Sequence, residues 1–322
     1  MARVVALAML ASAILIAPAA GQSTYPNKTI RIVVPATPGG GSDIFARLVA
    51  QHLSGVFKQQ VVVDNKPGGG TLVGMDVVLN APHDGHTLYL SPSTSTSMHV
   101  VRKTMPYEVM RVFTGVTQLV ILPQVLVIHP GVQAQTVRDY VALAKREPGK
   151  LSYGSAGLGT APHMAMELLK SMAGIDVQHI PYRGVSQSVT DILGGRVSGM
   201  ILNVLNSKPL VEQGQLRALG VTGRKRSEAL ANLPTIAESA VPNYEALQWF
   251  GILAPAATPP DIVELLQKNI AEGFRTTEMK ARLVIDGAEG VVNTPAEFNA
   301  LIKAEIMKWT ALGKAANIQS EE

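Results

Sequence analysis

Two glycine-rich segments, each between a short apolar strand and an amphipathic helix, carry the residue types that bind anions. They are Gly39-Gly40-Gly41-Ser42 and Ser155-Ala156-Gly157-Leu158-Gly159-Thr160. The start of a helix has unpaired N–H groups and a partial positive charge, and glycine lets the backbone approach a ligand closely. The hydroxyls of Ser42, Ser155 and Thr160 are further donors. We expect both segments to bind one anion, although a tight turn explains either segment alone equally well.

The spacing of these glycines argues against a nucleotide phosphate. A dinucleotide fingerprint needs a third glycine where the first segment has Ile44 and the second has Pro162. The chain also has no G-x-x-x-x-G-K-S/T motif. A carboxylate therefore fits the two segments better than a diphosphate.

Ser42 and Ser155 are also candidate nucleophiles, which makes an exported serine hydrolase the alternative hypothesis. Ser155 directly follows Gly154, so its surroundings do not form the G-x-S-x-G elbow. No serine has an evident acid–histidine partnership in the sequence, and the absence of cysteine excludes a thiol nucleophile. Binding without catalysis is therefore the favoured prediction.

Other polar residues lie beside these segments or at the ends of strands. Asp43, in the first turn of its helix, is a partner for the helix dipole or for a donor group of the ligand. His163 either touches the ligand or is a half-buried histidine, and Arg183 faces either the same crevice or solvent. Ser91 and Ser93, in a run of hydroxyl residues after a strand, are expected to line the cleft.

The sequence predicts neither a metal nor another cofactor, and no nucleic-acid partner. His83-x-x-His86 has the spacing of a metal-binding pair, but it lies in a turn-like segment without a second ligand pair. A surface loop is the better interpretation. The net charge of +4 is small, and no stripe of basic residues alternates with aromatics.

The elements that must position these residues alternate along the chain. Apolar strands are expected at 30–34, 61–64, 87–90, 124–129, 151–154, 177–180, 197–202 and 216–221, with helix-period stripes between them. Thr258 and Thr294 each begin a capping box with proline in the first turn, so the C-terminal part is expected to be helical. This alternation predicts an α/β fold with mostly parallel sheets flanked by helices.

The two glycine segments lie far apart in the chain, which indicates two lobes. Ligands of open α/β sheets bind beyond the carboxyl ends of the strands. A chain of this length usually divides into two units. We therefore expect one binding edge on each lobe, with the ligand between them.

The N-terminal segment is expected to be a signal peptide, residues 1–21, that directs the protein to the periplasm. Arg3 precedes an apolar run from Val4 to Ile16, and Ala17-Pro18-Ala19 has the small residues of a cleavage site. The apolar run is shorter than the ~20 residues of a membrane span.

The chain resembles the solute receptors of tripartite tricarboxylate transporters, the Bug or TctC type. The resemblance covers the chain from about Tyr25 to its end. It is carried, in order, by YPNKTIRIVVP, PGGGSD, VVVDNKPGGG, PHDGHTLYL, LPQVLVIHP, LSYGSAGLGTAPH, HIPYRG, DILGGRV, LRALGVTGRKRS, LPTIAES and WFGILAPAATPP.

This resemblance implies a two-lobed type II periplasmic binding protein, a monomer that binds a small carboxylate and serves membrane permease subunits, without catalysis or cofactor. Lobe 1 would comprise residues 22–124 and 249–322, and lobe 2 residues 125–248. The loops Thr37–Asp43 and Ser155–Thr160 would hold the carboxylate. The expected ligand-binding residues are Thr37, Gly40, Gly41, Ser42, Asp43, Ser91, Ser93, Ser155, Ala156, Gly157, Gly159, Thr160, His163, Arg183 and Asn203.

Departures from the family pattern indicate a more apolar cleft. The family often has Asp-Asn where this chain has Leu202-Asn203, proline where it has Leu205, and Gly and Asn where it has Thr71-Leu72. We expect an acid with an apolar or aromatic body and one carboxylate rather than citrate. Besides the hydrolase, a sensor that passes its ligand state to a signalling partner is an alternative function.

Overall fold

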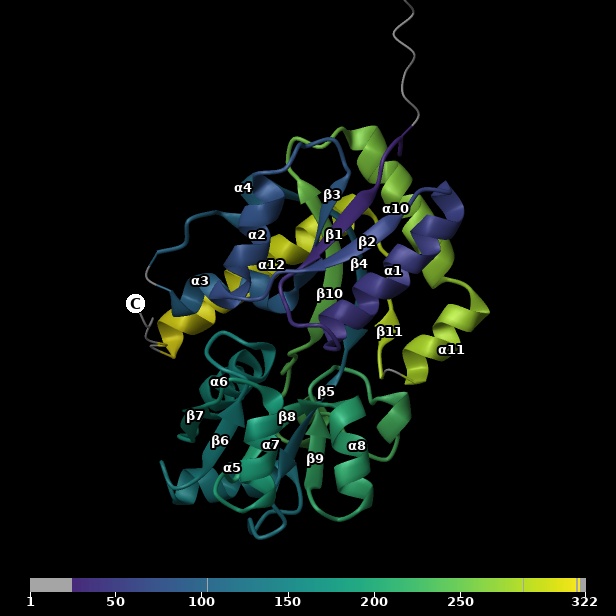
Figure 1. Cartoon of the computed structure of the whole chain (residues 1–322). Coiled ribbons are helices and arrows are strands. Elements are labelled where there is room, and N and C mark those ends of the chain that lie inside the picture. Colours follow the sequence, from purple (N-terminus) through teal and green to yellow (C-terminus); the bar gives the residue numbers. More distant parts are fainter. Residues whose placement is uncertain (1–24, 103, 286, 317, 319–322) are drawn as a thin grey trace, which may run out of the picture.

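Two sheets, each flanked by helices, form two lobes stacked one above the other (Figure 1). The computed structural model describes residues 25–102, 104–285, 287–316 and 318. The expected signal peptide lies outside the described residues. Within the described ranges, no helix is long and apolar enough to cross a membrane.

The first sheet contains six strands in the order β11-β4-β10-β3-β1-β2. β1 pairs in parallel with β2 and β3, whereas β10 runs antiparallel to β3 and β4, and β11 antiparallel to β4. Its strands are β1 (Ile30–Val34), β2 (Val61–Asn65), β3 (Thr87–Pro92), β4 (Phe113–Leu122), β10 (Gln248–Pro255) and β11 (Glu289–Gly290).

The second sheet contains five strands in the order β7-β6-β8-β5-β9. β6 pairs in parallel with β7 and β8, and β5 runs antiparallel to β8 and β9. Its strands are β5 (Gln124–Ile128), β6 (Ser152–Ser155), β7 (Gln178–Pro181), β8 (Gly199–Asn203) and β9 (Arg217–Val221).

The two-lobed α/β prediction is confirmed, but both sheets are mixed rather than mostly parallel. Among the named strands, parallel pairing is confined to β2–β1–β3 and β7–β6–β8. The chain crosses between lobes from β4 through Pro123 into β5, and it returns into β10. A strand that arrives from the other lobe enters its sheet at the edge where the parallel strands end. It therefore has to run in the opposite direction.

Twelve α-helices pack around the two sheets in the part of the chain that the structure describes. They are α1 (Gly41–Phe57), α2 (Leu72–Leu79), α3 (Met98–Val101), α4 (Val109–Val112), α5 (Val137–Arg146), α6 (Ala161–Ala173), α7 (Val185–Leu193), α8 (Val204–Glu212), α9 (Ile236–Ser239), α10 (Pro260–Phe274), α11 (Thr277–Ile285) and α12 (Pro295–Ala315). Short 3₁₀ helices lie at Gly69–Thr71, Ser93–Thr96 and Glu228–Leu230.

One of the two predicted C-terminal capping boxes is confirmed and the other is wrong. At α12 the hydroxyl of Thr294 accepts from the Glu297 N–H, and Glu297 returns the bond to the Thr294 N–H. At α10 the cap residue is Pro259, so Thr258 lies one position too early to reach the first turn. The buried Thr258 hydroxyl has no partner among the described residues.

Helix α12 is anchored in the cores of both lobes. Phe298 and Ile302, in its first half, belong to a core cluster of the first lobe, where Phe298 packs edge-on against Trp249. Trp309 and Leu312, in its second half, belong to the core of the second lobe. Figure 1 shows α12, in yellow, crossing the first lobe and ending beside α3 and above α6. The segment 249–322, assigned to lobe 1 by the sequence, thus also packs on lobe 2.

Candidate functional site

A cavity of about 320 Å³ lies between the two lobes, at the edge where strands end or enter. Pro35 follows β1, Pro92 ends β3 and Asn203 ends β8, and all three line the cavity. Gln124 and Gln248, the first residues of the crossing strands β5 and β10, line it as well. The volume lies in the usual range for small-molecule pockets, ~300–1,000 Å³.

Five of the described helices of eight or more residues begin at this cavity. The residues that mark these starts are Ser42 of α1, Thr71 before α2, Ala161 of α6, Val185 of α7 and Asn203 before α8. None of these five helices has a side chain capping its first N–H groups. The starts of α1, α6, α7 and α8 therefore offer a partial positive charge and unpaired donors at the cavity, whereas the Leu72 N–H that begins α2 already donates to the Gly69 carbonyl.

Among the described residues that line the cavity, none carries a charge at neutral pH. Their polar groups are the hydroxyls of Ser42, Thr71, Thr94 and Thr160 and the amides of Gln124, Asn203, Asn206 and Gln248. An anion in this cavity would therefore be held by helix N-termini and neutral donors rather than by lysine or arginine.

The first glycine loop is braced by Asp43. Its carboxylate accepts from the Gly39 N–H at 3.0 Å and from Arg47 Nε at 2.8 Å. The hydrogen bond from Arg47 lowers the pKa of Asp43, and the Gly39 bond acts in the same direction against the effect of burial. Gly39 has a φ of +86°, which favours glycine. Asp43 thus fixes the shape of the loop that presents Ser42 to the cavity.

The second glycine loop uses several of its own donors internally. The Gly157 N–H donates to Ser155 Oγ at 3.1 Å, and the Gly159 N–H donates to His163 Nδ1 at 3.1 Å. The Thr160 hydroxyl donates to the Gly157 carbonyl at 2.6 Å. These bonds brace the loop, from which Ala156 and Thr160 line the cavity.

A buried aromatic cluster lies behind this loop. Ser155 Oγ is 2.7 Å from His179 Nε2, and the His179 ring stacks on Tyr153 and lies 4.3 Å from the His163 ring. Burial lowers the pKa of His163 to about 4 and that of His179 to about 3, so both imidazoles are neutral at pH 7. Tyr153 donates to Glu167 Oε1 at 2.6 Å, and burial raises the pKa of its phenol.

Four of the predicted ligand-binding residues line the cavity: Ser42, Ala156, Thr160 and Asn203. The others lie around them. Four belong to the first glycine loop: Thr37, Gly40, Gly41 and Asp43. Two belong to the second glycine loop, Gly157 and Gly159, and two are buried behind that loop, Ser155 and His163. Ser91 and Ser93 are buried at the end of β3, and Arg183 is exposed.

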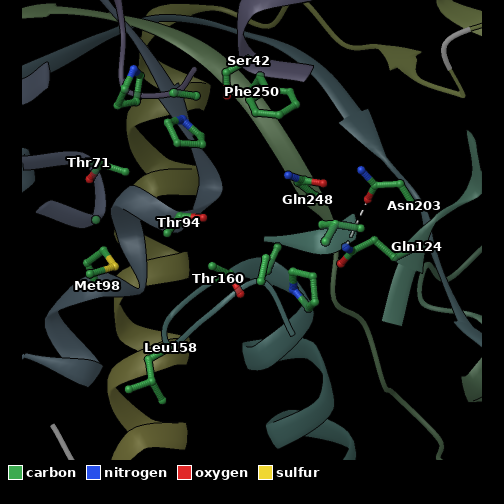
Figure 2. Close-up of a pocket in the computed structure, with 18 of the residues that line it drawn as sticks. Ser42, Thr71, Thr94, Met98, Gln124, Leu158, Thr160, Asn203, Gln248 and Phe250 are labelled. Carbon is green, nitrogen blue, oxygen red and sulfur yellow. Dashed lines mark hydrogen bonds between the residues drawn. The ribbon is translucent and has the colours of Figure 1, made fainter. Parts of the chain in front are cut away.

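Several residues of the cavity wall were not predicted from the sequence. Gly68, Gly70 and Thr71 line it, in a glycine run that was not among the predicted binding segments. The signal was the same as for the other two loops: glycines between a strand and a helix. Thr94, in the same hydroxyl run as Ser91 and Ser93, lines it too. So do Met98, Gln124, Gln248 and Phe250, whose local spacing does not point to a binding site (Figure 2).

Two α/β lobes, two crossing strands and a cavity ringed by helix N-termini define the class of two-lobed solute-binding proteins. Within that class the chain belongs to the tripartite tricarboxylate transporter receptor family, whose model matches residues 45–318. It is therefore a solute receptor of that family.

Curated relatives and solved structures agree with this assignment. The chain is 37% identical over 289 residues, 89% of this chain and 86% of the other, to the "UPF0065 protein in tcbD-tcbE intergenic region" of Pseudomonas sp. strain P51. It is 33% identical to protein BugT of Bordetella pertussis, with 90% and 89% of the two chains covered.

Among solved structures, R. palustris Rpa4515 with adipate has a TM-score of 0.81 and 34% identity, covering 91% of this chain and 98% of that one. The periplasmic binding protein BugD has a TM-score of 0.78 and 28% identity, covering 92% of this chain and all of that one.

Proposed function

We propose that this receptor binds a small organic carboxylate with an apolar or aromatic body and delivers it to a membrane permease. The observation that carries the proposal is the convergence of four helix N-termini, those of α1, α6, α7 and α8, on a cavity whose described lining has no charged side chain. An anion gains there from the helix dipoles and from donors that are already oriented.

The rest of the cavity wall supports an apolar body. Pro35, Met98, Leu158, Leu202 and Phe250 line it between the polar groups. The similar structure of R. palustris Rpa4515 contains adipate, a dicarboxylate whose two carboxylates are joined by an apolar chain. The expected ligand thus has a carboxylate at the helix starts and carbon atoms against these side chains.

Binding would work by closure of the two lobes. A carboxylate that docks on the helix starts of one lobe completes its contacts only when the other lobe arrives. The ligand then shifts the population toward the closed form by its differential affinity. The permease would recognise that closed form of a monomeric receptor in the periplasm. Ser155 does not line the cavity, which supports binding without turnover.

The proposal is tested by a thermal-shift and calorimetric screen of organic acids on the protein lacking residues 1–21. A ligand at 100 times its Kd should add ~2.7 kcal/mol to the free energy of unfolding. Adipate and benzoate-type acids are expected to bind more tightly than citrate. If no acid binds, the whole proposal fails. If citrate binds far more tightly than the other acids, the proposed apolar body of the ligand is wrong.

A charge placed in the cavity provides a matched variant. Ala156→Asp puts a carboxylate among the helix starts and is expected to weaken binding of every acid at least tenfold. Ala231→Asp adds the same charge at an exposed position of the second lobe and should leave affinity unchanged.

The alternative function, a serine hydrolase, is tested with ester substrates. Ester hydrolysis by the protein that is lost in Ser155→Ala would favour the hydrolase instead.

A further inference from the structure

Thr71 has a backbone conformation that a β-branched residue rarely adopts. Its φ is +96° and its ψ is −18°, at the position just before α2. It follows Gly68, Gly69 and Gly70, which all have positive φ, a conformation that glycine adopts without steric cost. Backbone strain of this kind persists where the surrounding structure enforces it, and it is concentrated at functional sites.

The Thr71 side chain forms part of the cavity wall. It is 7% exposed and lines the cavity. Figure 2 places it on the side opposite Gln124 and Asn203, with its hydroxyl oxygen directed away from them. That hydroxyl has no hydrogen bond of ordinary length within the described residues, but it interacts with the buried Tyr89 phenol and partly offsets the rise that burial causes in the pKa of Tyr89. The side chain therefore contributes bulk to the wall, and its carbon atoms face the interior.

Met98 completes this end of the cavity. A Cβ atom on Gly70 would lie 2.5 Å from Met98 Cε, so the methionine packs directly over the glycine. Met98 also lines the cavity, and Arg102 Nη2 holds the loop by donating to the Gly69 carbonyl at 3.0 Å. The carbon atoms of Thr71 and the Met98 side chain thus form an apolar part of the wall at this end. The opposite end carries the amides of Gln124 and Asn203, which are joined by a hydrogen bond of 3.2 Å.

We propose that Thr71 is a specificity-determining residue that sets the maximum length of the ligand. The apolar tail of the acid ends against the Thr71 side chain and Met98, and a glycine at position 71 would let it extend further. This inference rests on the proposed function, because it concerns the same cavity. It also accounts for a threonine at a position where glycine would remove the strain.

Three substitutions at position 71 distinguish the effect of side-chain volume in the cavity wall from the effect of backbone strain. Thr71→Gly removes both, Thr71→Asn keeps the bulk and tolerates positive φ, and Thr71→Val keeps the shape and the strain but loses the hydroxyl. The ligands are linear monocarboxylates from butanoate to octanoate and dicarboxylates from succinate to suberate. Affinity is measured by calorimetry, and Tm without ligand reports the strain.

The expected result is a shift of the preferred chain length in Thr71→Gly alone, by about one or two carbons, with about a fourfold gain for each methylene newly accommodated. Thr71→Val and Thr71→Asn should not prefer longer acids than the original protein. Tm should rise in Thr71→Asn, where the strain is relieved without loss of bulk.

Two outcomes overturn the inference while leaving the proposed function intact. One is an unchanged preferred length in Thr71→Gly with acids still bound. The other is the same lengthening in Thr71→Val, which would assign the effect to the hydroxyl. Failure of the unsubstituted protein to bind any of these acids would instead contradict the proposed function.

Discussion

The hydroxyl of Ser97, in the first lobe, donates a buried hydrogen bond of 2.8 Å to the carbonyl oxygen of Gly159, in the glycine loop of the second. Met98 and Val101 pack against the same glycine, which has a φ of +71° and no room for a side chain. The second glycine loop is therefore fixed from both sides: by its own lobe and by the segment that leads into α3.

Removing this bond is predicted to weaken ligand binding. The bond joins the two lobes, so it contributes only when they are together, and the closed form loses that contribution in Ser97→Ala. A buried carbonyl left without its donor costs enough to reduce affinity about tenfold. Calorimetry with the tightest acid of the screen measures the effect.

Ser54→Ala is the control for the Ser97 experiment. Ser54 Oγ accepts from the Val61 N–H within the first lobe, so its removal deletes a comparable bond that does not join the lobes. It should lower Tm without changing affinity. Equal affinity losses in the two variants would argue against an interlobe role for Ser97.

The anchoring of α12 in both cores predicts that the two lobes unfold together. Trp249 lies in the first lobe and Trp309 in the second, and the sequence has no other tryptophan. In Trp309→Phe, fluorescence of Trp249 and far-UV circular dichroism should give one midpoint in urea, and the same should hold for Trp309 in Trp249→Phe.

A core truncation at the far end of α12 tests this coupling directly. Leu312→Ala, made in the Trp309→Phe background, removes side-chain atoms from the second lobe and should cost about 2–5 kcal/mol. Because α12 links the cores, the transition reported by Trp249 should move to lower urea. A Trp249 transition that stays in place would show that the lobes unfold independently.

Helices and strands that have a local sequence signal were predicted. Strands that depend on pairing with segments far away in the chain were missed. The strand before the first glycine loop and the apolar stripe of α1 follow from short-range periodicity. The strands β4 and β10 were not predicted, and they meet only after the chain has built and left the second lobe.

The candidate site divides in the same way. The glycine loops are visible as motifs, because their chemistry lies in consecutive residues. Gln124 and Gln248 reach the cavity only because crossing strands begin there. His179 meets Ser155 because β6 and β7 pair in parallel, a register that the sequence does not reveal. The hydrophobic pattern indicated the strands and helices, and the glycine segments indicated the two lobes, but neither showed which residues of distant segments face each other.

His163 is predicted to make stability depend on pH below neutrality. Its pKa of about 4 in the folded protein lies below the ordinary value of ~6.5, so the unfolded chain takes up a proton that the native state does not. The free energy of unfolding should therefore fall as the pH drops from about 6.5 to 4. The histidine's share is about 1.4 kcal/mol per pH unit.

His163→Asn tests this prediction because its side-chain oxygen replaces Nδ1 as the acceptor for the Gly159 N–H. Urea unfolding at several pH values should show a shallower loss of stability in this variant. His83→Asn, at an exposed position, should follow the unsubstituted protein. Identical pH profiles for His163→Asn and the unsubstituted protein would contradict the buried neutral histidine.

Asp43 is predicted to make stability depend on pH in a lower range than His163. The hydrogen bond from Arg47 holds its pKa below the ordinary value, so its contribution to stability is present above about pH 4 and is lost as the pH falls through the lowered pKa. Asp43→Asn should destabilise the protein by about 1–3 kcal/mol at pH 7, because the bonds to Gly39 and Arg47 lose their charge. The difference from the unsubstituted protein should shrink as the pH is lowered from 5 to 2.

Asp261→Asn is the control for the Asp43 experiment. It changes an exposed acid in the first turn of α10 and should cost no more than about 0.5 kcal/mol. A pH-independent difference for Asp43→Asn would mean that shape, and not charge, braces the first loop.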